Sequence, residues 1–217
     1  MKRLAAVLLA LTLLAGCTVA SSNVGAAPES AHTHKTTTFG KYQGQAIEWY
    51  VLDQTDGRSL LLSVHALDSR PFSDRPATWA TSSLRSWLNA DFYNQAFSAS
   101  ERSNILLSKL QSKDDLKYGT TAGPDTEDHV FLLSASEAQR YLSGGETSAS
   151  PTEYALSRGA YTNERGDCAW WLRSPGMNNE GPAYYSSQGT IGTRAHEGSE
   201  SIIGVRPAIW VKTSALN

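Results

Sequence analysis

Alternating apolar and polar side chains predict a β-hairpin in the first third of the chain. Ile47, Trp49 and Val51 stand at every second position, which is the period of a half-buried strand. The pair Asp56-Gly57 follows and is a strong turn signal, and the apolar run 59–64 comes directly after it. Two such runs joined by Asp-Gly predict two antiparallel strands and a tight turn.

The middle of the chain shows helical spacing and helix-start signals. Residues 81–83 can cap a helix whose apolar side chains, through residue 88, share one face. The sequences Ser-x-x-Glu at 98–101 and 134–137 are capping boxes, in which side chain and backbone cap each other. The first box leads toward an apolar stretch, and the second predicts a short helix through Leu142.

The remaining pattern favours strands. Short apolar or aromatic runs predict strands at 130–133, 170–174, 183–186 and 203–212, and the polar stretch 111–128 predicts a long loop. No Pro- or Gly-rich linker divides the segment that carries them. The pattern therefore predicts a single α+β domain, long enough to bury a substantial core.

The first sixteen residues have the pattern of an export signal. Lys2 and Arg3 precede the apolar run 4–14, which is too short to span a bilayer comfortably. The following Leu14-Ala15-Gly16-Cys17 resembles the lipobox of bacterial lipoproteins, in which the Cys thiol is acylated and the chain is cut before it. This resemblance implies a lipid at Cys17 that holds the protein to the bacterial cell membrane, outside the cytoplasm. An ordinary signal peptide cut elsewhere is the alternative.

Residues 17–38 are predicted to be the lipidated cysteine and a flexible tether. The segment is rich in Ser, Thr and Ala and has no aromatic residue before Phe39, so it cannot bury enough apolar surface to fold. The predicted organisation is a signal peptide at 1–16, a tether at 17–38 and one folded domain at 39–217.

Charge and motifs limit the function classes. The net charge is −2, and it becomes −4 once the first sixteen residues are removed, so no basic excess predicts a nucleic-acid partner. The sequences G-x-S-x-G, Walker A and G-x-G-x-x-G do not occur, and His196-Glu197 lacks the second His of a zinc protease. We assign no catalytic residue, cofactor or metal.

The sequence offers few cysteine or carboxylate side chains as candidates for a catalytic role. With Cys17 lipidated, Cys168 stands alone, so no internal disulfide can form. Glu127, Asp128 and Glu153 are the candidates for a hydrolase that uses paired carboxylates. The acidic run that ends at His129 is an alternative cation site, although a polar turn explains it equally well.

Two arginines stand inside predicted strands. Trp170 is expected to face the core, and Trp171 and Arg173 share the opposite face because strand side chains alternate. Arg206 stands one residue before Pro207, which predicts a sheet edge or a bulge. An Arg in a half-buried strand is costly unless it is paired. We expect both arginines to form buried ion pairs or to bond to the backbone; ligand contact is the alternative.

Seven ordered blocks resemble a known family. They are WYVLD, ALDSRPF, TWATSSLRSWLNADFYNQAF, EDHVFLLS, PTEYA, WWLRSPG and GVRPAIW, and they cover about residues 39–212. They resemble an uncharacterised bacterial domain of unknown function that is common in secreted and surface proteins. That domain is in turn similar to the C-type-lectin-like superfamily, which includes formylglycine-generating enzymes. The resemblance implies an α+β fold with a mixed or antiparallel sheet, two flanking helices, and the WWLRSPG and GVRPAIW strands in one sheet.

The chain departs from the lectin pattern in its chemistry. The calcium-dependent sugar motifs Glu-Pro-Asn, Gln-Pro-Asp and Trp-Asn-Asp are absent, and so is the copper-binding cysteine pair of the enzymes. The expected function is therefore a calcium-independent surface module that binds a glycan, a wall polymer or a protein. A structural envelope lipoprotein and a carboxylate-dependent hydrolase are the alternatives.

Candidate ligand-binding residues surround the loop 176–182. Surface aromatic and polar side chains are expected to contact the ligand. Other large side chains in the neighbouring strands are expected to anchor the structure. The ligand-binding candidates are Trp171, Arg173, Tyr184, Tyr185, Asn178 and Asn179, and the anchors are Trp170, Arg206 and Trp210.

Overall fold

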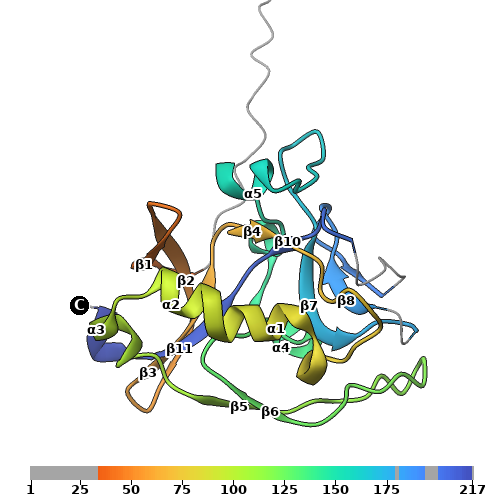
Figure 1. Cartoon of the computed structure of the whole chain (residues 1–217), viewed down its shortest axis with the longest axis horizontal. Helices are drawn as coiled ribbons and strands as arrows, with labels where there is room; N and C mark the ends of the chain where they lie inside the picture. The colour runs from red at the N-terminus through yellow and green to blue at the C-terminus, as the bar shows by residue number, and fades with distance from the viewer. Residues whose placement is uncertain (1–33, 179–180, 194–199, 217) are drawn as a thin grey trace, which may run out of the picture.

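The computed structural model describes residues 34–178, 181–193 and 200–216. Two larger sheets and several short helices form the body, so the α+β class is confirmed (Figure 1). Among the described residues, every helix is too short or too polar to cross a bilayer. The predicted signal peptide, Cys17, Asn179 and the pair His196-Glu197 lie outside the described residues.

One sheet is four-stranded and antiparallel, and it contains the predicted hairpin. Its order is β1-β2-β3-β11, with β1 at Thr36–Tyr42, β2 at Gln45–Thr55, β3 at Arg58–Ser63 and β11 at Ala208–Lys212. Asp56 and Gly57 both have positive φ, 48° and 72°, as a two-residue turn of this kind requires. The hairpin is confirmed.

The fold begins earlier than the predicted boundary at residue 39. Strand β1 starts at Thr36, inside the predicted tether, because its backbone pairs with β2 from Thr36↔Tyr50 onward. Just before it, the His34 backbone N–H donates to the buried Glu146 carboxylate at 2.8 Å. Backbone pairing and this contact therefore fix residues 34–38, whose composition alone predicts no structure.

The other large sheet has five strands in the order β4-β10-β7-β8-β9 (Figure 1). Its pairs are antiparallel except β10 with β7, which run parallel at Gly204↔Trp170. The strands are β4 (Asp68–Ser69), β7 (Trp170–Pro175), β8 (Pro182–Tyr185), β9 (Ile191–Gly192) and β10 (Gly204–Val205).

The single strand predicted at 203–212 is wrong, because the chain changes sheets within it. β10 lies in the five-stranded sheet and β11 in the four-stranded sheet, with Arg206 and Pro207 between them. Pro207 has no N–H to continue a ladder, and Arg206 donates instead to backbone carbonyls of other segments. The expected neighbourhood of the WWLRSPG and GVRPAIW segments therefore holds for β7 and β10, whereas β11 pairs with β3.

The helices are short, and their predicted caps are present. Ser82 accepts a hydrogen bond from the Arg85 N–H, and both Ser-x-x-Glu boxes, at 98–101 and 134–137, are complete. The helices are α1 (Ser83–Trp87), α2 (Tyr93–Ala96), α3 (Ala99–Arg102), α4 (Ala135–Tyr141) and α5 (Glu153–Ser157). A π-helical turn, η2 (Leu88–Phe92), joins α1 to α2, and the 3-10 turns are η1 (Trp79–Thr81), η3 (Gly144–Thr147) and η4 (Thr213–Leu216).

The segment 130–133 is not the strand that its apolar run predicts. It is fully buried, but it pairs with a neighbour only through the bridge Phe131↔Ala208. The carbonyl of Val130 accepts from the Asn89 side chain at 2.8 Å, and the carbonyl of Leu133 accepts from the Arg173 N–H at 3.0 Å. The run therefore satisfies its backbone through separate partners rather than a ladder. The prediction of a loop over 111–128 is wrong for its last three residues. They form strand β6 (Thr126–Asp128), which pairs with β5 (Ser108–Leu110).

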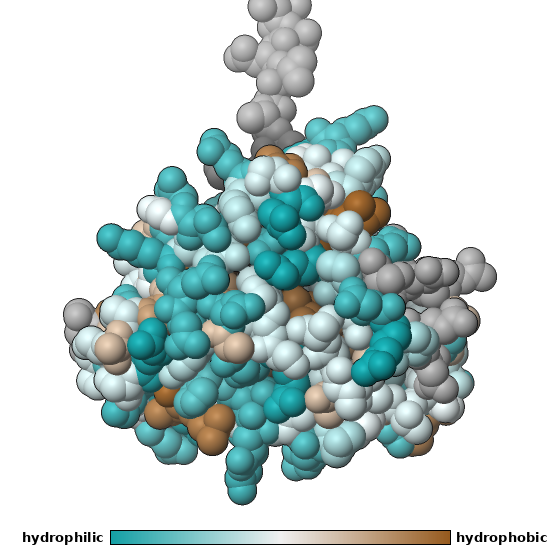
Figure 2. Space-filling view, viewed as in Figure 1, coloured by the Kyte–Doolittle hydropathy of each residue, from teal (hydrophilic) through white to brown (hydrophobic). Residues whose placement is uncertain are grey.

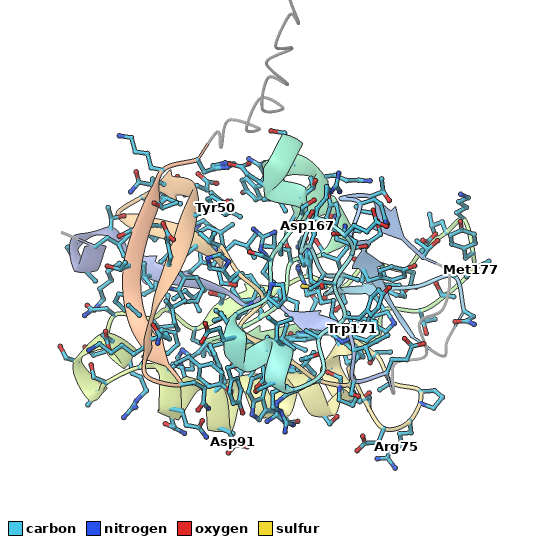
Figure 3. The ribbon with its side chains drawn as sticks, turned by 90° about the horizontal axis from the view of Figure 1, so that it is seen from above. Tyr50, Arg75, Asp91, Asp167, Trp171 and Met177 are labelled. Carbon is cyan, nitrogen blue, oxygen red and sulfur yellow. The ribbon has the colours of Figure 1, made fainter. Side chains whose placement is uncertain are left out.

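Strand β7 crosses the interior and is covered on both faces. Its first four residues, 170–173, are all buried. The Trp170 ring stacks on Tyr185 with centroids 4.7 Å apart, whereas Trp171 packs against Phe72 at 6.1 Å. Figure 3 shows Trp171 inside the body and Arg75 at its rim. The core therefore extends to both sides of this strand.

Candidate functional site

A groove of about 690 Å³ lies beside strand β11. Its floor is formed by β3 and β11, one wall by α4 and the other by the segment 109–113. Strand β7 reaches it with Arg173 and Ser174. These parts are far apart in sequence, so the groove exists only in the folded chain.

The floor carries an arginine stacked on a tryptophan. Leu60 is directly opposite Trp210 in the β3–β11 pairing, and Arg58 stands two positions before Leu60. Because alternate strand residues share a face, all three lie on the groove side of the sheet. The Arg58 guanidinium carbon is 4.8 Å from the Trp210 ring centroid, within cation–π distance.

The α4 wall presents a second aromatic ring with an arginine above it. Tyr141 lines the groove at the last turn of α4, and its hydroxyl donates to the Asp53 carboxylate at 3.0 Å. Burial, together with that carboxylate, raises the pKa of Tyr141, so the hydroxyl stays protonated and fixed as a donor. The Arg140 guanidinium carbon is 5.1 Å from the same ring.

Arg173 holds α4 against β7. Its Nη2 donates to Glu137 Oε1 at 2.9 Å, its Nη1 donates to Glu137 Oε2, and Nη1 also donates to the Leu132 carbonyl at 3.2 Å. Burial alone would raise the pKa of the Glu137 carboxyl, but Arg173 and the Ser134 cap outweigh it and leave the pKa below its ordinary value. The expectation that Arg173 forms a buried ion pair is confirmed.

The groove is strongly cationic although the chain is not. Five cationic side chains line it against a single carboxylate, Glu137, which Arg173 already pairs. The described chain offers no ion-pair partner to Arg58, Lys113 or Arg140, and all three are exposed. Lys109 is 3.8 Å from Glu127 at the surface. The groove therefore concentrates positive charge in a protein whose net charge is −2.

A second pocket, of about 400 Å³, adjoins the groove. The two share Ala122, Arg173 and Ser174, so Arg173 stands at their boundary. Phe72, four prolines and several threonines line the second pocket, and Arg173 is the one charged side chain among its lining residues. The predicted ligand residue Asn178 lines it as well, half-buried.

Two of the predicted surface aromatics are in the core. Trp171 is fully buried, and its Nε1 donates to the Arg70 carbonyl at 2.9 Å. Tyr185 is buried against Trp170, whereas Tyr184 is half-buried. The expectation that Trp171 and Tyr185 lie at the surface is therefore wrong, because both faces of β7 are covered and Tyr185 of β8 packs on Trp170.

The three candidate carboxylates for hydrolysis are not brought together. Asp128 is buried and accepts from Trp79 Nε1 at 2.9 Å and Arg85 Nε at 2.7 Å. Its neighbour Glu127 is exposed, and Glu153 lines a separate pocket together with Glu48. No group of three potential metal ligands is present in the described part of the chain.

Arg206 is a structural side chain, as expected. It is fully buried, donates to the Ser63 and Glu146 carbonyls at 2.7 Å each, and lies over the Tyr50 and Trp170 rings. Burial lowers its pKa to about 10, which still leaves it charged at neutral pH.

Burial also raises the pKa of the Cys168 thiol to about 12, so this thiol is a poor nucleophile.

The sequence analysis does not identify Arg58, Arg140 or Tyr141 as site residues, because no local sequence pattern marks them as ligand-binding. Arg58 follows an ordinary turn, and Arg140 and Tyr141 end an ordinary capped helix. Trp210, which the sequence predicts as a structural anchor, is half-buried and lines the groove.

The comparison with protein families gives one match. The model described as Domain of unknown function (DUF6273) matches residues 56–213, well over half of the chain and all of the groove. No curated protein and no solved structure matches the chain. The predicted resemblance to an uncharacterised domain is confirmed, and the chain belongs to the family of that domain of unknown function, DUF6273.

Proposed function

We propose that this protein is a binding module, tethered outside the cytoplasm to a bacterial membrane, that holds a glycan, wall polymer or surface protein in the groove beside β11. The observation that carries the proposal is the groove itself, with Tyr141 and Trp210 at its surface and polar side chains around them. Aromatic faces combined with a few placed polar groups are typical of ligand sites.

Three contacts hold the α4 wall of the groove in place. The complete Ser134–Glu137 capping box fixes the start of α4, the Arg173–Glu137 pair joins it to β7, and the Tyr141–Asp53 bond joins its end to β2. A site whose walls are fixed before binding loses less conformational entropy when the ligand arrives. This arrangement favours a binding surface that is present in the free protein.

The chemistry of the groove favours binding over hydrolysis. Glycosidic hydrolysis needs two carboxyl groups flanking one bond, with the acid held protonated by a raised pKa. Among the lining residues Glu137 is the one carboxylate, its pKa is lowered, and both its oxygens are bonded to Arg173. We therefore propose no catalytic role for this site.

We further propose that a lipid at Cys17 anchors the protein and that the folded domain is C-type-lectin-like. The lipobox-like Leu14-Ala15-Gly16-Cys17 supports a lipid anchor at Cys17. The seven ordered sequence blocks and the α+β arrangement of short strands and helices support a C-type-lectin-like fold without calcium. Replacement of Cys17 by Ser is expected to release the protein from the membrane fraction; retention in membranes would rule out the anchor.

The test of binding uses the full chain in a nonionic detergent. Immobilised protein is offered cell-wall fragments, a glycan array and a lysed-cell surface extract, alongside Trp210→Ala and the control Tyr161→Ala. Tyr161 is an exposed aromatic residue that does not line the groove. Ligand retained by the parent and Tyr161→Ala, but lost with Trp210→Ala, supports the proposal. No retention by the parent, or equal retention by both variants, overturns it and favours a structural envelope role.

A further inference from the structure

We propose that the groove binds a polyanion: a wall polymer that carries phosphate or carboxylate groups repeated along its chain. This inference rests on the proposed binding function and names the chemistry of its ligand. It is carried by the excess of four positive charges among the groove residues, in a chain of net charge −2.

The cations surround the groove. Arg58 rises from the floor, Arg140 from the α4 wall and Lys113 from the opposite rim. An extended anionic chain lying in the groove would thus meet positive charge on several sides. A neutral polymer would gain nothing from this arrangement, and like charges gathered on one surface repel one another until an anion arrives.

Arg58 and Arg140 differ from the arginines that stabilise the fold. Within the described ranges, neither guanidinium has a carboxylate within ion-pair distance or a hydrogen bond to another residue. Five other arginines lie within 4.0 Å of a carboxylate oxygen: Arg70, Arg85, Arg158, Arg165 and Arg173. The two groove arginines therefore retain their donors for a ligand.

The ring contacts of Arg58 and Arg140 leave their guanidinium N–H groups available to bind oxyanions. Arg58 lies over Trp210 and Arg140 over Tyr141, and the guanidinium plane keeps its N–H groups at the edge when a face is stacked. A guanidinium offers paired donors that match the oxygens of phosphate or carboxylate. The ring contact limits the motion of the side chain, so less entropy is lost when the anion binds.

Shape favours a polymer strand over a bilayer surface. The cations border a concave space of about 690 Å³ that is closed by α4 on one side and residues 109–113 on the other. A flat lipid headgroup layer contacts convex or planar surfaces, whereas a single chain can enter a groove. Lipid headgroups are nevertheless a second source of phosphate and need a separate arm of the test.

The experiment measures binding of the full chain in nonionic detergent to four probes by biolayer interferometry. The probes are long-chain inorganic polyphosphate, polygalacturonate, neutral dextran and a water-soluble short-chain phosphatidylglycerol. The groove variant is Lys113→Glu with Arg140→Glu. The matched control is Lys41→Glu with Arg75→Glu, which changes the net charge equally at exposed positions outside the groove.

We expect polyphosphate, polygalacturonate or both to bind, with dextran and the lipid weaker. The groove variant should weaken this binding roughly tenfold or more, and the control by less than about twofold, because reversed charges act on a nearby anion. Raising the salt concentration should weaken binding by the parent, a readout that needs no variant. Which polymer binds identifies phosphate or carboxylate as the recognised group.

The inference is overturned if neither polyanion binds, if dextran or the lipid binds more tightly than both, if salt has no effect, or if the control loses as much as the groove variant. If wall fragments are still retained by the parent and lost with Trp210→Ala in any of these cases, the proposed binding function is supported. Only the inference that the ligand is a polyanion is then overturned. Unchanged thermal midpoints of both variants establish that the comparison is made between folded proteins.

Discussion

The two arginines of the WWLRSPG and GVRPAIW segments are compensated in opposite ways. Arg206 is fully buried, donates from Nε and Nη1 to two backbone carbonyls, and lies over aromatic rings. Arg173 pairs with the Glu137 carboxylate at the boundary of two pockets. Both stand in similar sequence contexts, yet one stabilises the crossing between two sheets and the other positions the wall of the groove.

This difference separates a region that stabilises the fold from the region that forms the candidate groove. Backbone carbonyls around Arg206 tie strand β3 and turn η3 to the point where the chain changes sheets. The Arg173–Glu137 pair instead fixes a helix whose outer residues, Arg140 and Tyr141, face the groove. The face seen in Figure 2 is mainly hydrophilic, with hydrophobic side chains in small separate groups.

The largest effect is expected at the sheet crossing. Arg206→Ala should lower the free energy of unfolding by about 3–5 kcal/mol, because it leaves two buried carbonyls without a donor and opens a cavity beside Trp170. Urea unfolding followed by tryptophan fluorescence measures the change. Arg58→Ala, at an exposed position, is the control and should change stability by less than about 0.5 kcal/mol. If Arg206→Ala lowers the free energy of unfolding by less than about 1 kcal/mol, Arg206 contributes little more to stability than the exposed Arg58, and its structural role is contradicted.

A smaller effect is expected at the groove wall. Glu137→Gln should cost about 2 kcal/mol, because it leaves the buried Arg173 without its counter-charge while half-exposure of Glu137 admits water. The control is Glu127→Gln, which removes a surface carboxylate near Lys109 and should cost less than about 0.5 kcal/mol. Equal losses in the two variants, measured by urea unfolding, would contradict the assigned difference.

Acid should reduce the cost of that same substitution. The pKa of Glu137 is lower in the folded protein than its ordinary value of 4.5, so its stabilisation is complete above that value and is lost as pH falls through the folded pKa. The gap in unfolding free energy between the parent and Glu137→Gln should therefore be largest near pH 7 and smaller near pH 3. A gap that stays constant over this range would mean that ionisation of Glu137 does not contribute to stability.

The smallest effect on stability is expected at the exposed cations. Lys113→Glu with Arg140→Glu should change the free energy of unfolding by less than about 0.5 kcal/mol, since neither residue has an ion-pair partner in the described chain. Thermal unfolding measures it directly. A clear destabilisation would show that these side chains support the fold, and it would weaken the distinction between the two regions.

Local signals predicted local structure well. The Asp56-Gly57 turn and both Ser-x-x-Glu boxes involve contacts between residues two to four apart, and the structure contains all three. The buried run 130–133 and the single strand at 203–212 were wrong because their hydrogen bonds go to Asn89, Arg173 and two different sheets. Such long-range partners leave no periodic mark in the segment itself.

The candidate groove was less predictable than the fold. Arg173 was identified as important because a charge inside a strand is costly, and that reasoning depends on one residue alone. Arg58, Arg140 and Trp210 meet only after β3, α4 and β11 have packed. Trp171 was misplaced because alternation assigns one strand face to solvent, whereas both faces of β7 are covered.

The sheet crossing also bears on the order in which the chain can fold. β10 lies between β4 and β7, and β11 closes the edge of the other sheet, so both sheets lack a strand until residues 204–212 are available. Until then β3, β4 and β7 have unpaired edges, and residues 204–212 complete both sheets in one cooperative, long-range step, which is the slow kind of β-sheet assembly. Folding of the domain is therefore expected to be limited by the docking of residues 204–212, which must join both sheets at once.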